Sequence, residues 1–166
     1  QEIMVIVAAL SIQDPRERPQ QAQQKADTLH QRFHDKDSDF MAYLNLWNYL
    51  QTQQHELSKS QFRKRCKQEF LHFLRIREWQ DVYTQIRQTV REIGLPINSE
   101  PANYEAIHRA LLSGLLSHIG TKAEQFEFQG ARQRKFFIFP GSGLFKKSPK
   151  WVMSAELVET TRLYAR

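Results

Sequence analysis

RKFFIFPGSGLFKKSPKW, residues 134–151, places an aromatic run, a glycine turn and several lysines next to one another. In its first part the side chains fall into two alternating sets, Lys135, Phe137 and Phe139 against Phe136 and Ile138. An alternation of period two predicts a β-strand with one side in a core and the other side exposed. Either set can form the core, and the alternative that every phenylalanine is a packing residue stays open.

The same alternation extends to both sides of this stretch. From about residue 117 the apolar pattern is no longer helical, and QFEFQG (125–130) and WVMSAELVETTRLYA (151–165) have the patterns of short strands separated by polar turns. Several short strands of this kind predict a small antiparallel barrel or sheet.

The residues before this region have helical patterns instead. QEIMVIVAALS (1–11) is almost continuously apolar, so we expect a helix that is buried on more than one side. Apolar residues repeat at spacings of three and four in QQAQQKADTLHQRF (20–33) and in a third segment that Ser38 or Asp39 caps. The chain begins without Met or a cap, which suggests a fragment of a longer protein.

Three more helices are expected before the strands. The fourth begins at Ser58 or Ser60, and one face of it carries Phe62, Cys66, Phe70 and Phe73. The fifth ends at Gly94, a residue suited to a left-handed cap, and Ser99 caps the sixth. The predicted fold class is therefore α+β, an N-terminal helical bundle followed by a small β-domain.

Positive charge is concentrated in the second part of the chain. The formal net charge is +6. Residues 1–101 carry 14 Lys+Arg against 13 Asp+Glu, whereas residues 102–166 carry 10 against 5. An anionic partner, nucleic acid first, is the natural expectation for such a distribution, and the alternative is a basic surface that serves solubility alone.

Several functional classes lack the residues that they need. No apolar run reaches the roughly 18 residues of a membrane-spanning helix, and a single cysteine gives no disulfide framework. GSGLFKKS (141–148) lacks the spacing of a phosphate loop, and DKDSD (35–39) lacks the glycine and the distal glutamate of a calcium loop. We therefore expect a cytoplasmic protein part without a catalytic residue, and DKDSD is interpreted as a connector and helix cap.

The Pro-Gly-Ser-Gly turn at residues 140–143 has two interpretations, and the first is a binding role. Its glycines let backbone N–H groups approach a phosphate, Ser142 adds a hydroxyl, and Lys146, Lys147 and Lys150 supply charge. The alternative is a plain tight turn.

Five motifs in order give the chain a family resemblance. The chain resembles the region after the winged-helix domain of DEAH-box RNA helicases. The motifs that carry the resemblance are VIVAALSIQDPRERP (5–19), ADTLHQRFHDKDSDFMAYLNLW, RCKQEFL with IRQTVREIGL, IHRALLSGLLSHIG, and FPGSGLF with WVMSAELVETTRLYAR. The segment SIQDPRERP (11–19) is most similar to the corresponding segment of the bacterial HrpA-type branch.

The resemblance implies two domains with known roles in that family. Residues 1–101 would form a ratchet-like helical domain and residues 102–166 an oligonucleotide-binding (OB) fold, with the first helix, 102–117, at the junction. In that family the two domains close over a single strand held by an ATPase core and help translocation in the 3′ to 5′ direction. The core motifs are absent, so ATP and Mg²⁺ are expected in a core outside this chain, which itself would hold no cofactor or metal.

The charge distribution and the turn give the expected site residues, and the resemblance implies the partners. Six residues would hold RNA phosphates while the helical domain walls the channel: Arg134, Lys135, Ser142, Lys146, Lys147 and Lys150. Ser142 matches one of the two serines of the family's turn, whereas Arg65 and Phe139 stand where the family has Trp and His. The implied partners are single-stranded RNA and the helicase core of the same protein, with no membrane. The alternative is a protein-interaction module for activator proteins, which an exposed apolar patch without adjoining lysines would indicate.

Overall fold

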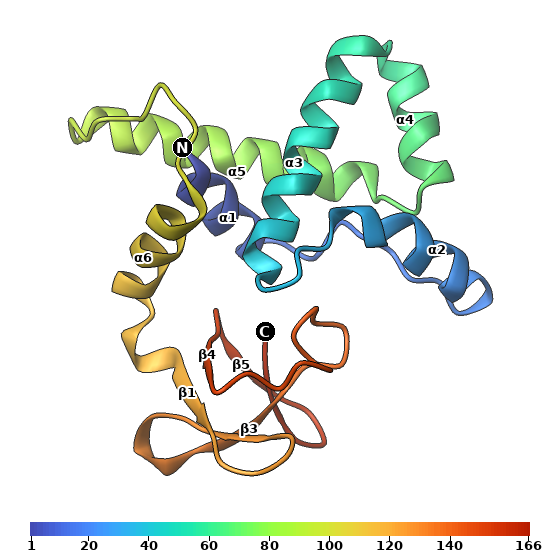
Figure 1. Ribbon diagram of the computed structural model, residues 1–166. Helices are drawn as coiled ribbons and strands as arrows, with labels where there is room; N and C mark the ends of the chain where they lie inside the picture. The colour runs from blue at the N-terminus through green and yellow to red at the C-terminus, as the bar shows by residue number, and fades with distance from the viewer. The chain divides into compact units, whose positions relative to one another are not determined.

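The computed structural model describes residues 1–166 and divides into two compact units (Figure 1). The helical unit comprises residues 1–34 and 40–102, and the β unit comprises residues 35–39 and 103–166. The β unit thus includes a short segment from the N-terminal part of the chain, and the sequence does not predict that this segment joins the β unit.

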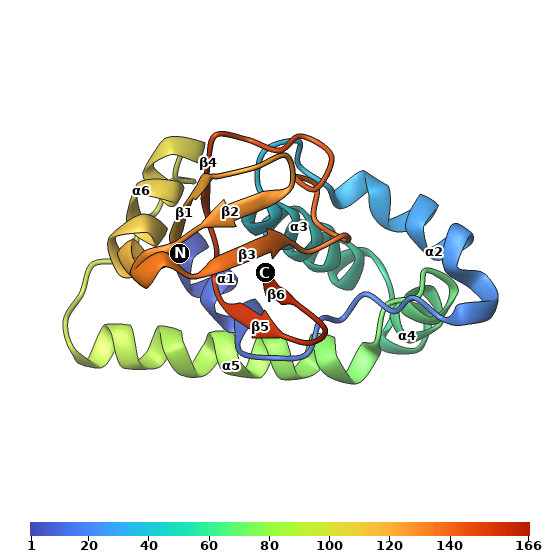
Figure 2. The ribbon, with the colours of Figure 1, turned by 90° about the horizontal axis from the view of Figure 1, so that it is seen from below.

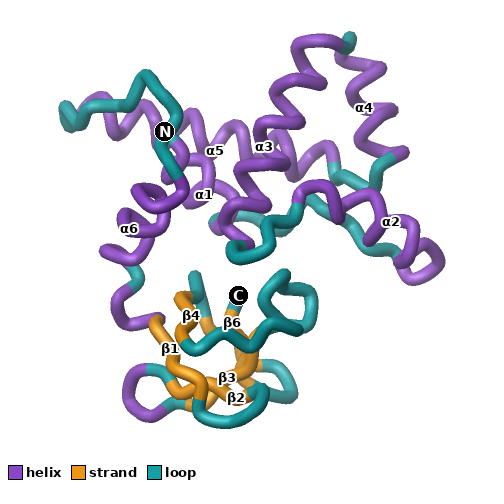
Figure 3. Tube along the Cα trace, viewed as in Figure 1, coloured by secondary structure: helices purple, strands orange, loops and turns teal.

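The helical unit consists of five α-helices, which Figure 3 shows in purple. They are α1 (Glu2–Leu10), α2 (Gln23–His30), α3 (Asp39–Glu56), α4 (Lys59–Gln68) and α5 (Phe73–Glu92), and 3₁₀ turns at Gln20–Ala22 and Gln31–Phe33 extend α2 on both sides. The expected helices at 1–11, at 20–33 and from Asp39 onwards are confirmed. Gly94 has a φ of 74°, which confirms the left-handed cap predicted after the fifth helix.

The core of this unit lies between α1, α3 and α5. α1 packs against α5, and its buried side chains include Val5 and Ile6. Trp79 of α5 is fully buried, and its indole N–H donates a hydrogen bond to the carbonyl oxygen of Val5 at 2.9 Å. The ring of Trp47 meets Trp79 edge-on at a centroid distance of 5.0 Å. The apolar character of α1 is therefore explained by burial against a second helix.

The fourth helix is shorter than the sequence indicates. Ser58 and Gln61 form a capping box at its start, but the helix ends at Gln68 and Phe70 has a positive φ of 54°. The backbone leaves the helix because the next residues pair with another segment: Glu17 N–H donates to the Phe70 carbonyl at 2.8 Å, and His72 N–H donates to the Pro15 carbonyl at 2.7 Å. The prediction that Phe70 and Phe73 continue the fourth helix is thus wrong.

A buried polar cluster lies around Glu69 in the helical unit. The carboxylate of Glu69 accepts a hydrogen bond from the Tyr49 hydroxyl at 2.7 Å and forms an ion pair with Arg32. His30 Nε2 lies 2.9 Å from the Glu69 carbonyl, and burial lowers the pKa of this imidazole. His30 is therefore a structural residue of this cluster.

The predicted cap of the sixth helix is also wrong. α6 (Tyr104–Gly114) begins after Asn103, whose side chain accepts a hydrogen bond from Ala106 N–H at 2.8 Å. The residues around Ser99 are held elsewhere, because Glu2 accepts hydrogen bonds from Asn98 at 2.9 Å and from Ala102 N–H at 3.3 Å. A tertiary contact therefore delays the helix by four residues.

The β unit contains α6, a 3₁₀ turn at Leu116–His118 and a six-stranded sheet. The strands are β1 (Ile119–Lys122), β2 (Glu127–Gln129), β3 (Lys135–Ile138), β4 (Trp151–Met153), β5 (Leu157–Glu159) and β6 (Leu163–Ala165), in the order β4-β1-β2-β3-β6-β5. The sheet curls into a half-barrel, which confirms the α+β class. Figure 2 shows β2, β3 and β6 side by side.

The sheet differs from the prediction in one respect. Four of its pairings are antiparallel, but β3 and β6 run parallel, with Phe137 opposite Tyr164 and Ile138 opposite Ala165. The reason is the chain path: the segment after β3 crosses to pair β4 with β1, and β5 and β6 then return to the other edge. Without a hairpin between β3 and β6, nothing requires them to be antiparallel.

The inner face of the sheet settles which side of residues 135–139 is core. Phe128, Phe136, Ile138, Val152 and Ala165 are buried together. Gly120 lies against this core, because a Cβ placed there would come within 2.3 Å of the Phe136 ring. Lys135, Phe137 and Phe139 consequently occupy the outer face.

Candidate nucleic-acid interface

The turn that follows β3 is held by its own polar groups. Ser142 N–H donates to the Phe139 carbonyl at 2.9 Å, and Phe145 N–H donates to the Ser142 carbonyl at 3.2 Å. The Ser142 hydroxyl accepts a hydrogen bond from Leu144 N–H at 3.0 Å. Ser142 therefore stabilises the turn itself, and its proposed contact with RNA stays a prediction.

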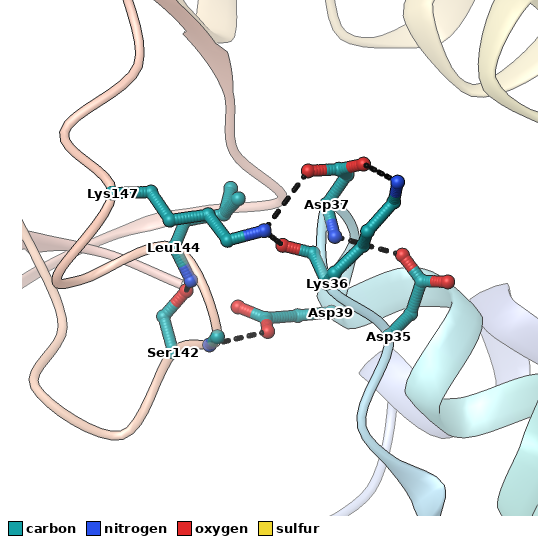
Figure 4. A network of polar contacts seen from close by, with 8 residues as sticks. Asp35, Lys36, Asp37, Asp39, Ser142, Leu144 and Lys147 are labelled. Atoms are coloured by element: carbon teal, nitrogen blue, oxygen red, sulfur yellow. Dashed lines mark hydrogen bonds and ion pairs between the residues drawn. The ribbon is translucent and has the colours of Figure 1, made fainter.

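An acidic segment of the chain occupies the basic turn (Figure 4). Gly143 N–H donates to a carboxylate oxygen of Asp39 at 2.9 Å. Lys147 Nζ lies 3.1 Å from a carboxylate oxygen of Asp37 and also donates to the carbonyl of Lys36. A Cβ at Gly143 would lie only 3.0 Å from the carbonyl oxygen of Asp35, so this close approach favours glycine. Two of the groups predicted to bind a phosphate here, the Gly143 N–H and the Lys147 ammonium, thus bind carboxylates of the same chain.

This contact changes the charge of the β unit. Residues 103–166 carry 10 Lys+Arg and 5 Asp+Glu, a net charge of +5. The acidic segment, residues 35–39, adds one lysine and three aspartates, which brings the unit to +3. DKDSD was interpreted as a connector and helix cap, and this further role was not predicted because nothing in the segment indicates which distant turn it meets.

The remaining predicted cations differ in their surroundings. Arg134, Lys146 and Lys150 are exposed, and their side chains make no ion pair in the structure. Lys135 pairs with Glu127 on the neighbouring strand at 2.7 Å, and the hydrogen bond and charge of that carboxylate raise the pKa of the lysine. Lys135 is exposed whereas Glu127 is half-buried, and the pair links two neighbouring strands. Arg134, Lys146 and Lys150 are the predicted site residues that remain available to an external anion.

The outer face of β3 and β6 carries a set of aromatic and basic side chains that the prediction included only in part. We call it the β3–β6 face, and it consists of Lys135, Phe137, Phe139, Arg162, Tyr164 and Arg166. Phe137 and Tyr164 lie 6.4 Å apart between ring centroids, and Phe139 and Tyr164 lie 6.2 Å apart. The arginines cover two of the rings, with Arg162 4.9 Å from the Phe137 centroid and Arg166 5.5 Å from the Phe139 centroid.

The sequence contains a signal for half of this face. The period-two alternation in RLYAR (162–166) places Arg162, Tyr164 and Arg166 on one side of a strand. The sequence does not show that β3 pairs in parallel with β6, and this pairing sets the side with Arg162, Tyr164 and Arg166 beside Phe137 and Phe139.

None of the helices combines the length and the apolar character needed to cross a bilayer.

Comparisons with known proteins agree with these features. Residues 107–166 match the family model described as oligonucleotide/oligosaccharide-binding (OB)-fold, which confirms the expected OB type of the β-domain. The chain is 64% identical over 166 residues to the ATP-dependent RNA helicase HrpA of Escherichia coli (strain K12) and 67% identical to the HrpA homolog of Haemophilus influenzae. Each match covers 99% of this chain but 13% of the relative, so the chain spans about an eighth of those proteins.

Proposed function

We propose that this chain, which is 64–67% identical to a segment of two HrpA-type helicases, supplies single-stranded RNA binding and channel closure to a DEAH-box RNA helicase during 3′ to 5′ translocation. The observation that carries the proposal is the sequence match, which runs through both units. ATP and Mg²⁺ would act in a core outside these residues, and this chain would work by binding alone.

The surface of the β unit supports the RNA-binding part of the proposal. Arg134, Lys146 and Lys150 are exposed cations without a carboxylate partner, as expected of residues that contact phosphates. The OB-type sheet is a fold that binds oligonucleotides on its face and loops. Backbone contacts of this kind give affinity with little preference for sequence.

A protein-docking role is the weaker candidate. It predicts an exposed apolar patch without adjoining cations. The aromatic rings of the β3–β6 face instead have Lys135, Arg162 and Arg166 beside them, an arrangement that favours an anionic ligand.

Fluorescence anisotropy across a salt series tests the proposal. The chain is titrated into a labelled single-stranded RNA, and the double variant Lys146→Ala/Lys150→Ala is compared with the wild type. Each lost phosphate contact should reduce the slope of log affinity against log salt by about 0.7, with no change in sequence preference.

The matched control removes the same charge from the helical unit. Lys25 and Lys59 are exposed, so Lys25→Ala/Lys59→Ala should leave the salt slope of the wild type unchanged. Absence of RNA binding by the wild-type chain at low salt would contradict the proposed binding role. An equal slope for wild type and Lys146→Ala/Lys150→Ala would remove these two lysines from the site.

A further inference from the structure

The β3–β6 face has a composition that a solvated sheet face does not normally have. An antiparallel sheet with one face on the core usually presents polar residues to water on the other. Here the residues that alternate with the buried Phe136 and Ile138 include Phe137 and Phe139, and the adjoining strand adds Tyr164. Phe139 leaves 43% of its surface exposed. These rings lie on the side of the sheet opposite the buried cluster.

The three rings form a row rather than scattered positions. Tyr164 is central, with Phe137 directly opposite it in the parallel ladder and Phe139 meeting it edge-on at an interplanar angle of 89°. The Phe139 ring lies over Gly141, where a Cβ would come within 2.8 Å of it. The turn therefore fixes the position of the ring while leaving part of it accessible.

Positive charge surrounds the row. Arg162 and Arg166 lie over the rings of Phe137 and Phe139, and Lys135 precedes them on the same side of β3. In the ladder, Glu127 stands opposite Phe137, and its carboxylate is already paired with Lys135. A ligand that matches this face therefore combines flat apolar groups with negative charge.

We propose that the β3–β6 face is a stacking platform for the bases of single-stranded RNA, with Phe139 and Tyr164 as the stacking rings and Arg162 and Arg166 as partners for the neighbouring phosphates. The proposal rests on the proposed function and adds to it the part of the ligand that the lysines do not contact. Aromatic rings and guanidinium planes both stack on unpaired bases, so the arginines can either cover a base or turn to a phosphate. Such a platform accepts any base and suits an enzyme part that moves along a strand.

The test separates stacking from charge. Phe139→Leu keeps an apolar side chain of similar size but removes the flat ring, and because Phe139 is exposed this variant should keep the melting temperature of the wild type. Its affinity for a single-stranded RNA should fall roughly 5- to 100-fold, with the salt slope unchanged. Tyr164→Phe retains the ring and should bind like the wild type.

Two further measurements identify the stacked base. In an RNA that contains the fluorescent base 2-aminopurine, the wild-type chain should change the fluorescence on binding, and Phe139→Leu should lose most of that change. On an abasic strand, which has phosphates without bases, the wild type and Phe139→Leu should bind equally. Phe126→Leu serves as the control, because Phe126 is 50% exposed but lies outside the face, next to Phe145.

The outcomes distinguish this proposal from the function on which it rests. If Phe139→Leu binds the normal strand as well as the wild type while Lys146→Ala/Lys150→Ala loses salt slope, the platform is wrong and phosphate binding stands. If Phe139→Leu weakens the abasic strand equally, the ring acts through the fold and the platform is again wrong. If the wild-type chain binds no RNA, both proposals fail.

Discussion

In the helical unit the large aromatic rings point into the core, whereas in the β unit a row of them lies on the outer face of the sheet. Trp79 is completely buried and is packed edge-on by Trp47. Phe139, in contrast, is 43% exposed and has an arginine over its ring. The same type of side chain thus stabilises one unit and remains available for a ligand in the other.

Because of this difference, a substitution of an aromatic residue should affect stability in one unit and ligand affinity in the other. Removing a ring from the helical core should lower stability, whereas removing one from the β3–β6 face should lower affinity and leave stability nearly unchanged. A loss of stability from a substitution on the β3–β6 face, or a loss of affinity without loss of stability from one in the helical core, would contradict this difference.

The largest expected effect is at the centre of the helical unit. Trp79→Ala removes a buried ring and its hydrogen bond to Val5, so it should lower the free energy of unfolding by roughly 3–5 kcal/mol. Urea denaturation followed by far-UV circular dichroism, which the helices dominate, measures this loss. Leu74→Ala on the same helix is the control, because Leu74 is 67% exposed and should change stability by less than about 0.5 kcal/mol. A loss below about 1 kcal/mol for Trp79→Ala would show that this core is not tightly packed.

The next effect tests the core of the β unit. Gly120→Ala places a Cβ within 2.3 Å of the buried Phe136 ring, so it should destabilise the chain by about 1–3 kcal/mol. Gly114→Ala, where nothing lies within 4 Å of the added carbon at the end of α6, should be neutral or slightly stabilising. The two variants are compared by thermal melting. Equal melting temperatures would mean that the sheet moves to admit the methyl group, contrary to a fixed core.

The smallest effect concerns the acidic segment. Asp37→Asn removes the partner of Lys147, and because both side chains are about half exposed the stability should change by at most about 1 kcal/mol. The freed lysine should raise RNA affinity by at most about fivefold, an increase that added salt reduces. Asp81→Asn, an equal change of charge at an exposed position of α5, provides the comparison in the anisotropy assay. If both variants raise the affinity equally, net charge alone explains the effect and the local contact is irrelevant.

Local patterns predicted most of the fold. The apolar run of α1, the cap at Ser58 and the left-handed Gly94 each depend on residues close in sequence, and all three are confirmed. The errors at Phe70 and Ser99 have a common cause, because contacts with Pro15, Glu17 and Glu2 override the local preference. Distant partners of this kind leave no mark in the local pattern.

The candidate site was predictable to a smaller extent. The lysines after the turn form a charged run in the sequence. The alternation in residues 135–139 predicted one exposed and one buried side of a strand, but not which side is buried. Burial of Phe136 and Ile138 decided it. The parallel pairing with β6 and the docking of residues 35–39 depend on the complete chain path, so they required the structure.

The inclusion of residues 35–39 in the β unit matters for anyone who cuts the chain at its apparent boundary. A fragment of residues 103–166 would contain every strand but would lack the acceptors for Gly143 N–H and Lys147. It would also carry a net charge of +5 instead of +3. Such a fragment would bind polyanions through groups that the longer chain satisfies internally, and its affinity would overstate that of the intact region. The shortest piece with a native turn therefore begins before Asp35, even though the whole sheet lies more than 80 residues later.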